Sequence, residues 1–348
     1  MATAPHSTGQ GGPSRPGGPS GREAPRRFRW ALASVAILLA ILLLSLLLLA
    51  LFQRRLVYLP DPILHDTPAS VGLSYEDIRF HASDGTELDG WYISAPGARA
   101  TVLLCHGNAG NISTRLPAIS ALHELGVNLF LFDYRGYGAS GGTPSEQGTY
   151  RDGEAAWQWI ADHSQITGGA PVIVMGRSLG GAIAARLARR HRVAGLILEA
   201  AFPSIPKLLD ARVPFLPLEL VAAFRYDTER DLKEVSCPVL VAHSRADRVV
   251  PFRLGRELYD RAREPKSFIE LRGPHDTGFS SDRRRYLGAL EAFINEAVGT
   301  AGDKTMGSVG SGAAVVGRAK SGYTGAALPA GTAASSLTMP FERGGREL

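Results

Sequence analysis

The chain has 348 residues, enough for one large α/β domain with appended segments. Its formal net charge of +5 belongs to the two ends, because residues 1–29 carry +4 and residues 299–348 carry +2, which leaves −1 for the stretch between them. That nearly neutral stretch gives no support for a nucleic-acid-binding domain. The two cysteines, Cys105 and Cys237, are too few for a disulfide framework or a zinc site.

The N-terminal region predicts a membrane anchor. Residues 1–29 are rich in Gly, Pro, Ser and Arg, which predicts disorder. From Trp30 to Gln53 there is no charged residue, and a helix over the Leu-rich part reaches ~33 Å, enough to cross a ~30 Å hydrocarbon core. We therefore predict a transmembrane helix at 30–53. A cleaved signal peptide is the alternative, but its apolar region is usually shorter and is followed by a small-residue cleavage site.

Arginines on both sides of the anchor predict its orientation. More of them precede the apolar stretch than follow it, which places the N-terminus in the cytoplasm and the rest of the chain outside. The protein is then a single-pass membrane protein. These flanking residues are Arg22, Arg26, Arg27 and Arg29 before the anchor and Arg54 and Arg55 after it.

Residues 56–298 form the predicted folded domain. An extended connector covers 58–72, and strands at 78–82 and 88–94 form an antiparallel pair. Strands and helices then alternate, which predicts a mainly parallel, doubly wound sheet covered on both faces. The strands are predicted at 101–105, 127–132, 172–175, 196–199, 239–243 and 267–271, and the helices at 116–125, 146–163, 182–188, 254–263 and 286–298. Residues 299–348 lack periodicity and are predicted to be a disordered tail.

The strand at 172–175 and the helix at 182–188 enclose the motif Gly176-Arg-Ser-Leu-Gly180. This is G-x-S-x-G in the context that the nucleophile elbow requires, with a strand before it and a helix after it. Such a motif also arises by chance in Gly-rich chains, so the flanking elements are what give it weight. The tight turn holds Ser178 in a strained backbone conformation at a helix N-terminus, where free N–H groups stabilise negative charge.

A nucleophilic serine needs a base, and the base needs a carboxylate to orient it. Active sites of doubly wound sheets form at the carboxyl ends of strands, so we expect the partners just past the later strands. Asp247 follows one of these strands and His275 follows another, and Ser-Asp-His is the order associated with the elbow motif. Glu199, at the end of the strand that follows the Ser178 elbow, is the alternative acid. Asp276 is a less favoured candidate for the acid than Asp247.

The oxyanion of an acyl transfer needs hydrogen-bond donors. One predicted donor is the backbone N–H of Leu179, directly after the nucleophile. The other is the N–H of Asn108, in the loop His106-Gly-Asn-Ala-Gly-Asn111. A Gly-rich loop also suits phosphate, but this one has neither a Gly-Lys-Ser/Thr ending nor a G-x-G-x-x-G pattern.

Five motifs together resemble the α/β-hydrolase superfamily: the His106 loop, Asp133-Tyr-Arg-Gly-Tyr-Gly138, the Ser178 elbow, and the Asp247 and His275 loops. Within it, the chain is similar to membrane-anchored serine hydrolases of the Bem46 and ABHD13/ABHD17 type. The resemblance implies an α/β-hydrolase fold over about 56–298. It implies a structural role for residues 133–138. It implies no metal ion and no organic cofactor.

The same resemblance assigns the site residues. Ser178 is the implied nucleophile, His275 the general base and Asp247 its orienting acid, with Asn108 and Leu179 lining the oxyanion hole. Ser244 departs from the pattern, because many relatives have Gly after the strand-end histidine.

The predicted function is cleavage of a carboxylic ester or thioester by a membrane-anchored serine hydrolase. About forty residues between Glu199 and Val239 are rich in apolar side chains and prolines. They either cover the sheet or form an apolar rim over Ser178 that suits an acyl chain. The predicted substrate is therefore a small-molecule or lipid acyl ester presented at a membrane. A serine peptidase of the same fold and a non-catalytic membrane scaffold are the alternatives, since fold alone does not fix the substrate.

Overall fold

The computed structural model of the chain describes residue 12 and residues 26–215 and 222–309. Residues Met1–Thr305 form one compact unit and Met306–Leu348 a second, of which only the end of a helix is described. The predicted disorder of the N-terminal tail falls mostly outside the described residues, and so does that of the C-terminal tail beyond residue 309.

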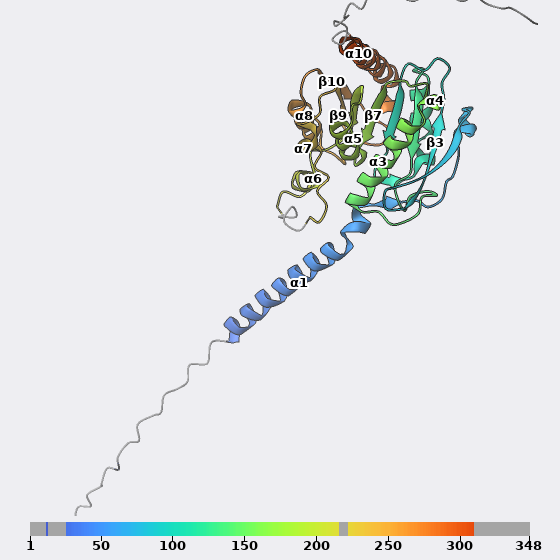
Figure 1. Ribbon diagram of the computed structural model, residues 1–348. Coiled ribbons are helices and arrows are strands. Elements are labelled where there is room, and N and C mark those ends of the chain that lie inside the picture. Colours follow the sequence, from blue (N-terminus) through green and yellow to red (C-terminus); the bar gives the residue numbers. More distant parts are fainter. Residues whose placement is uncertain (1–11, 13–25, 216–221, 310–348) are drawn as a thin grey trace, which may run out of the picture. The chain divides into compact units, whose positions relative to one another are not determined.

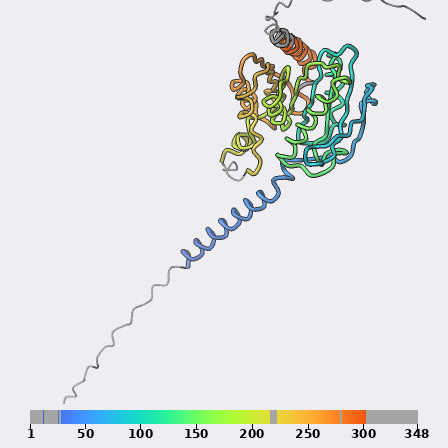
Figure 2. Tube along the Cα trace, viewed as in Figure 1, coloured from blue at the N-terminus to red at the C-terminus, as the bar shows by residue number. Residues whose placement is uncertain are grey.

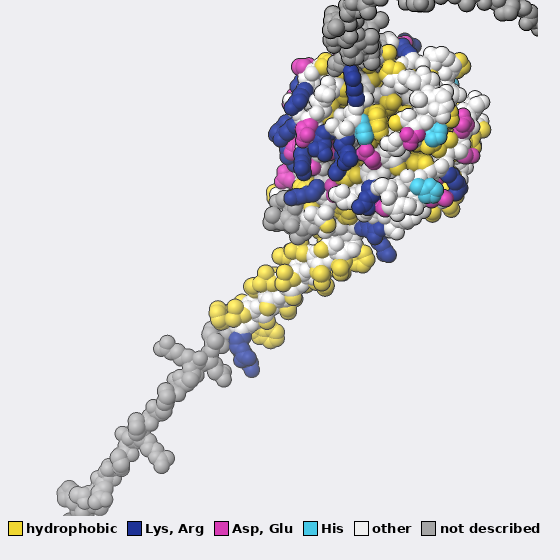
Figure 3. All heavy atoms as spheres, viewed as in Figure 1, with side chains coloured by type: hydrophobic (Ala, Val, Ile, Leu, Met, Phe, Trp, Pro, Cys, Tyr) yellow, Lys and Arg dark blue, Asp and Glu magenta, His cyan; other side chains and the backbone are white. Residues whose placement is uncertain are grey.

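The apolar stretch near the N-terminus forms one long helix, α1 (Arg26–Val57). The most apolar 18-residue window of its span Phe28–Val57 has a mean hydropathy of 3.3, and none of that window is buried against the rest of the chain. Figure 3 shows them exposed along the visible face of the helix. Leu and Ala favour the helix, and a helix that is apolar all round needs an apolar environment. In length and composition α1 is suited to crossing a membrane.

The domain is built on an eight-stranded sheet with the order β10-β9-β8-β7-β4-β6-β3-β2 (Figure 1). β2 pairs antiparallel with β3 and β3 antiparallel with β6, while the remaining neighbours are parallel. The strands are β2 Glu76–His81, β3 Glu87–Ile93, β4 Thr101–Cys105, β6 Asn128–Phe132, β7 Val172–Arg177, β8 Gly195–Glu199, β9 Val239–Ser244 and β10 Lys266–Leu271. This confirms the predicted mainly parallel sheet with an antiparallel pair at one edge.

Helices cover both faces of this sheet. The two hydrophobic cores separate accordingly: one holds side chains of α3, α5, α7 and α8, and the other those of α2 and α10. Figure 1 shows α3 and α5 in front of the strands, and Figure 2 follows the same path as a trace. The helices are α2 Leu116–His123, α3 Glu146–Asp162, α4 Ser164–Thr167, α5 Gly180–Arg190, α6 Ile205–Arg212, α7 Thr228–Leu232, α8 Phe252–Arg261, α9 Gly278–Ser281 and α10 Arg283–Val309.

Three features differ from the sequence-based expectation. α1 begins at Arg26, so residues 26–29, predicted as part of the disordered tail, are helical. α10 continues to Val309, whereas the predicted helix ends at Val298 and gives way to the tail. No proline interrupts this stretch, so its three glycines, Gly299, Gly302 and Gly307, weaken the helix without ending it. The predicted connector also contains a short strand, β1 (Leu59–Pro60), which pairs in parallel with β5 (Ala109–Gly110).

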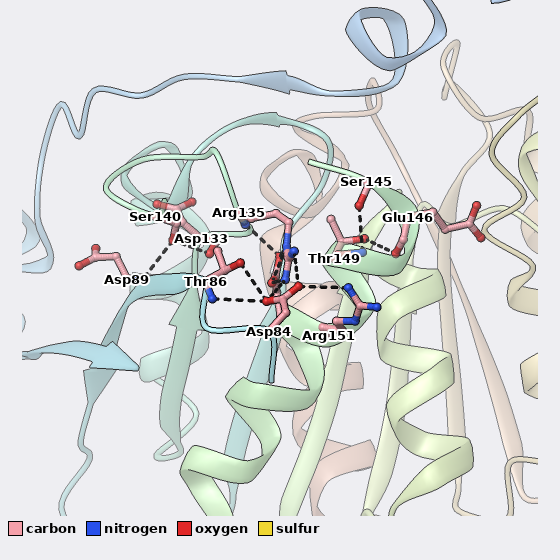
Figure 4. A network of polar contacts seen from close by, with 12 residues as sticks. Asp84, Thr86, Asp89, Asp133, Arg135, Ser140, Ser145, Glu146, Thr149 and Arg151 are labelled. Atoms are coloured by element: carbon pink, nitrogen blue, oxygen red, sulfur yellow. Dashed lines mark hydrogen bonds and ion pairs between the residues drawn. The ribbon is translucent and has the colours of Figure 1, made fainter. Parts of the chain in front are cut away.

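The motif at 133–138 is held by a buried ionic network (Figure 4). The Arg135 guanidinium donates to both Asp152 oxygens on α3, from Nη2 at 2.8 Å and Nε at 3.1 Å, and to Asp84 in the β2–β3 turn at 2.8 Å. The side chain of Asp152 is 0% exposed. Burial raises the pKa of Asp152, and the hydrogen bonds from Arg135 oppose that shift. The network joins three segments that are distant in the sequence, as expected for a structural motif.

Removing Arg135 is therefore expected to destabilise the domain, because it leaves the Asp152 carboxylate buried and unpaired. Arg135→Met should lower the free energy of unfolding by about 3–5 kcal/mol. The matched control is Arg283→Met, which breaks a pair with Glu124 in which both side chains are exposed, and it should cost far less. Urea unfolding of both variants measures the difference, and equal losses would contradict a structural role for the Arg135 network.

Candidate active site

Ser178 occupies the tight turn between β7 and α5. Its φ angle is +53°, in the left-handed region that side chains rarely adopt. The turn is also crowded: a Cβ on Gly180 would lie 2.1 Å from the Cys105 carbonyl oxygen, and one on Gly176 would lie 2.4 Å from the Gly180 oxygen. The Ser178 N–H donates to the Glu199 carbonyl at 2.9 Å. Ser178 thus has the geometry of a nucleophile elbow, as predicted.

Asp247 and His275 lie together, from loops after β9 and β10. His275 Nδ1 is 2.7 Å from Asp247 Oδ2, and because the carboxylate accepts, Nδ1 carries the hydrogen. Asp247 Oδ1 accepts from the N–H groups of Val249 and Val250 at 2.8 Å each. Burial alone would raise the pKa of Asp247, but hydrogen bonds from His243 and His275 hold it well below its usual range. Asp247 is therefore an ionised, fixed acceptor that leaves His275 Nε2 free to act as a base.

Hydrogen bonds between loops set the position of His275. Ser244 Oγ donates to the Gly273 carbonyl at 2.5 Å, which ties the end of β9 to the loop that carries His275. Arg177 Nη2 donates to the His275 carbonyl at 2.7 Å, which ties the same loop to the residue before Ser178. Ser244, which departs from the family pattern, thus has a structural function here.

Within the described residues no hydrogen bond joins Ser178 to His275. Catalytic hydrogen bonds are often long without substrate and tighten in the complex, so the missing contact does not remove either residue as a candidate.

The loop 106–111 after β4 lies beside the elbow, as predicted for an oxyanion loop. A Cβ on Gly107 would lie 3.6 Å from the Ser178 Cβ. Among the described residues, neither the N–H of Asn108 nor that of Leu179 donates to another group of the protein. Two unused donors next to a serine are suited to an oxyanion. The Asn108 side-chain amide points elsewhere and donates to the Val57 carbonyl at 2.9 Å.

The two alternative acids are engaged away from His275. The Glu199 carboxylate is buried, accepts from the Tyr286 hydroxyl and lies 3.4 Å from Arg177. The Asp276 side chain is 83% exposed and lies 3.5 Å from Arg177. Neither forms a hydrogen bond with His275 in the described part of the chain, which favours Asp247 as the acid.

Sequence reasoning missed Arg177 as part of this site. It occupies a variable position of G-x-S-x-G, where no residue type carries a signal. In the structure its guanidinium contacts Glu199, His275 and Asp276, so it connects β8 to the histidine loop. Over the described residues no cluster of His, Cys, Asp and Glu is arranged to hold a metal ion.

A cavity of about 530 Å³ lies far from these residues. Pro171, Ala194 and Pro238, which precede β7, β8 and β9, line it at the amino ends of the strands. Reaction sites of doubly wound sheets form at the carboxyl ends, which is where Ser178 lies. The cavity is therefore not the candidate active site.

In its described part, the segment between β8 and β9 mainly covers the sheet, and the predicted rim over Ser178 stays a prediction. Phe202 and Ile205 are buried in the core, as expected if the segment covers the sheet. The helix α6 has only eight residues and ends before Pro214, and the Phe215 side chain is 93% exposed. Leu208, Leu209 and Phe224 also pack against that core, and the apolar residues at 216–221 lie outside the described residues.

Comparisons with known proteins match the same region. The family described as serine aminopeptidase, S33, matches residues 96–226. The alpha/beta hydrolase domain-containing protein WAV2 of Arabidopsis thaliana is 36% identical over 253 residues, covering 64% of this chain and 81% of that protein. Lysophosphatidylserine lipase ABHD12 of Danio rerio is 37% identical over 199 residues, covering 51% of each chain. A solved esterase of Pyrococcus furiosus has a TM-score of 0.60 at 19% identity, covering 70% of this chain and 98% of its own.

The crowding at the elbow predicts a large effect of a single methyl group. Gly180→Ala places its Cβ against the Cys105 carbonyl and should cost about 3 kcal/mol of unfolding free energy. Gly288→Ala is the matched control on α10, where a Cβ meets nothing within 4 Å, and it should stabilise by about 0.5–1 kcal/mol. Thermal unfolding of both variants checks the pair. A stable Gly180→Ala variant would show that the turn is looser than described.

Proposed function

Because the chain belongs to the α/β-hydrolase superfamily, we propose that it is a membrane-anchored serine hydrolase that cleaves carboxylic esters or thioesters. The observation that carries the proposal is the hydrogen bond between Asp247 and His275, at the same edge of the sheet as the strained Ser178. Nucleophile, base and acid occur in the chain order of this fold.

The proposed reaction uses each of these groups once in acylation. His275 Nε2 takes the Ser178 proton as Oγ attacks the substrate carbonyl carbon, and the carbonyl oxygen becomes an oxyanion held by the N–H groups of Asn108 and Leu179. When the tetrahedral intermediate collapses, His275 gives the proton to the leaving alcohol or thiol. Water, activated by His275, then attacks the acyl-enzyme and releases the carboxylic acid and free Ser178.

The apolar helix α1 and the comparisons support an acyl substrate at a membrane. α1 is long and apolar enough to hold the domain close to a bilayer, where lipid esters are concentrated. One relative carries the name of a lysophosphatidylserine lipase and a structural neighbour that of an esterase, while the matched family description is that of an aminopeptidase. We therefore favour lipid or other acyl esters, with peptide amides as the alternative. The cytoplasmic position of the N-terminus stays a prediction from the arginine bias.

The triad is tested by removing each group in turn. Ser178→Ala and His275→Ala should each lower kcat on a 4-nitrophenyl ester by about 10⁴-fold or more, and the double variant scarcely further, since the pair acts as a unit. Asp247→Asn should lower kcat less than either of these variants, and Glu199→Gln should lower it less than Asp247→Asn. Ser280→Ala, an exposed serine, should leave activity unchanged.

Covalent labelling separates the enzyme from a scaffold. A fluorophosphonate probe should label the wild type and fail on Ser178→Ala. A wild type that neither reacts with the probe nor cleaves any ester would favour the scaffold, and a larger loss in Glu199→Gln than in Asp247→Asn would move the acid to Glu199.

The role of the anchor is tested with two substrates. Full-length protein in vesicles and a soluble chain of residues 56–348 should cleave water-soluble 4-nitrophenyl acetate alike. Only the anchored protein should cleave vesicle-embedded 4-nitrophenyl palmitate well, because it shares the surface with the substrate. Equal rates on the embedded ester would remove the anchor from substrate access, and cleavage of peptide amides alone would assign the protein as a peptidase.

A further inference from the structure

The residues that leave α1, Val57–Asp61, run beside the loop 106–111; we call them the exit segment and the His106 loop. The Leu59 N–H donates to the Asn108 carbonyl at 3.0 Å, and the Asp61 N–H to the Gly110 carbonyl at 3.2 Å. These bonds belong to the parallel pair of β1 and β5. In return, the Asn108 side-chain amide donates to the Val57 carbonyl at 2.9 Å. Asn108 is thus bonded to the exit segment through both its backbone and its side chain.

The exit segment is a rigid continuation of the helix, fixed to the domain. The Tyr58 N–H donates to the Arg54 carbonyl at 2.9 Å, so helical hydrogen bonding runs directly into it. The Tyr58 side chain is buried, and its hydroxyl lies 2.6 Å from that of Tyr226. Arg54 Nε donates to the Pro144 carbonyl at 2.7 Å. The exit segment is therefore held by hydrogen bonds both to the end of α1 and to the domain.

The domain holds the other side of the same loop. The Tyr137 hydroxyl donates to the Asn108 carbonyl at 2.8 Å. His106 Nδ1 lies 2.7 Å from the Gly107 carbonyl, whose peptide unit also contains the Asn108 N–H. The orientation of that N–H thus depends on two sets of bonds, one from the domain and one from the exit segment. A transition-state donor has to be held within about 0.5 Å of its productive position.

We propose that the exit segment positions the Asn108 N–H for the oxyanion, so that the segment by which α1 joins the domain is a structural part of the active site. This inference rests on the proposed serine-hydrolase function. An oxyanion forms only in the transition state and the intermediate. Loss of the positioning bond should therefore lower kcat and leave KM unchanged.

The direct test is Leu59→Pro in the full-length protein, which removes the N–H that donates to Asn108. The Leu59 side chain is 52% exposed, so Leu59→Ala is a matched control that keeps the N–H and loses little packing. With 4-nitrophenyl acetate, Leu59→Pro should lower kcat per titrated active site about 10- to 100-fold, less than removal of a donor costs. KM should stay within about twofold, and Leu59→Ala should match the wild type in both constants.

A second variant decides the matter if Leu59→Pro does not fold. Asn108→Ala keeps the backbone N–H but loses the bond to Val57, and it too should lower kcat at constant KM, with a thermal unfolding midpoint close to that of the wild type. If Leu59→Pro folds and keeps the wild-type kcat, the inference is overturned. If Leu59→Pro does not fold, a wild-type kcat in Asn108→Ala overturns it. In both cases an active wild type leaves the proposed function standing. A wild type without ester hydrolysis would instead defeat the proposed function itself.

Discussion

The close approach of three strand ends at the turn before α5 is the constraint on which the candidate site depends. β4 ends against Gly180, since a Cβ there would meet the Cys105 carbonyl at 2.1 Å. The segment after β8 ends against Gly181, where a Cβ would lie 2.6 Å from the Ala201 Cβ. Ser178 and Ala200 both have left-handed backbones, with φ of +53° and +48°. Such strain persists only where the surroundings determine the conformation, and here tight packing against backbone atoms does so.

At this edge of the sheet, the groups around Asp247 keep its buried carboxylate ionised. Asp247 accepts from two backbone N–H groups on one oxygen and from His275 on the other, and together these outweigh the cost of burial. Glu199 is equally buried but faces Tyr286 and Arg177. Two acids at the ends of neighbouring strands thus have different environments. The donors around each acid, rather than its place in the sequence, determine which one orients the histidine.

Local patterns in the sequence were sufficient for the sheet, because each strand is short, apolar and followed by a helix of clear composition. β4 was predicted as Thr101–Cys105 and lies there. The elbow was predictable because Gly176 and Gly180 are needed for space at fixed positions around Ser178. The course of α10 past Val298 could not be predicted, because three glycines after that residue leave helix and tail nearly balanced. The contacts of Arg177 could not be predicted either, because they join parts of the chain about 98 residues apart and leave no local sequence pattern.

The pairing of β1 with β5 could not be predicted either, because two residues per strand show no periodicity. The position of Pro60 is nevertheless compatible with this pairing for a physical reason. Along a strand alternate N–H groups point to the same side, so Leu59 and Asp61 donate to the His106 loop while residue 60 faces away. A proline there loses no bond to the loop. It also offers no donor on the outer side, where a further strand would otherwise pair. Pro60 thus leaves both backbone hydrogen bonds from the exit segment to the loop beside Ser178 intact.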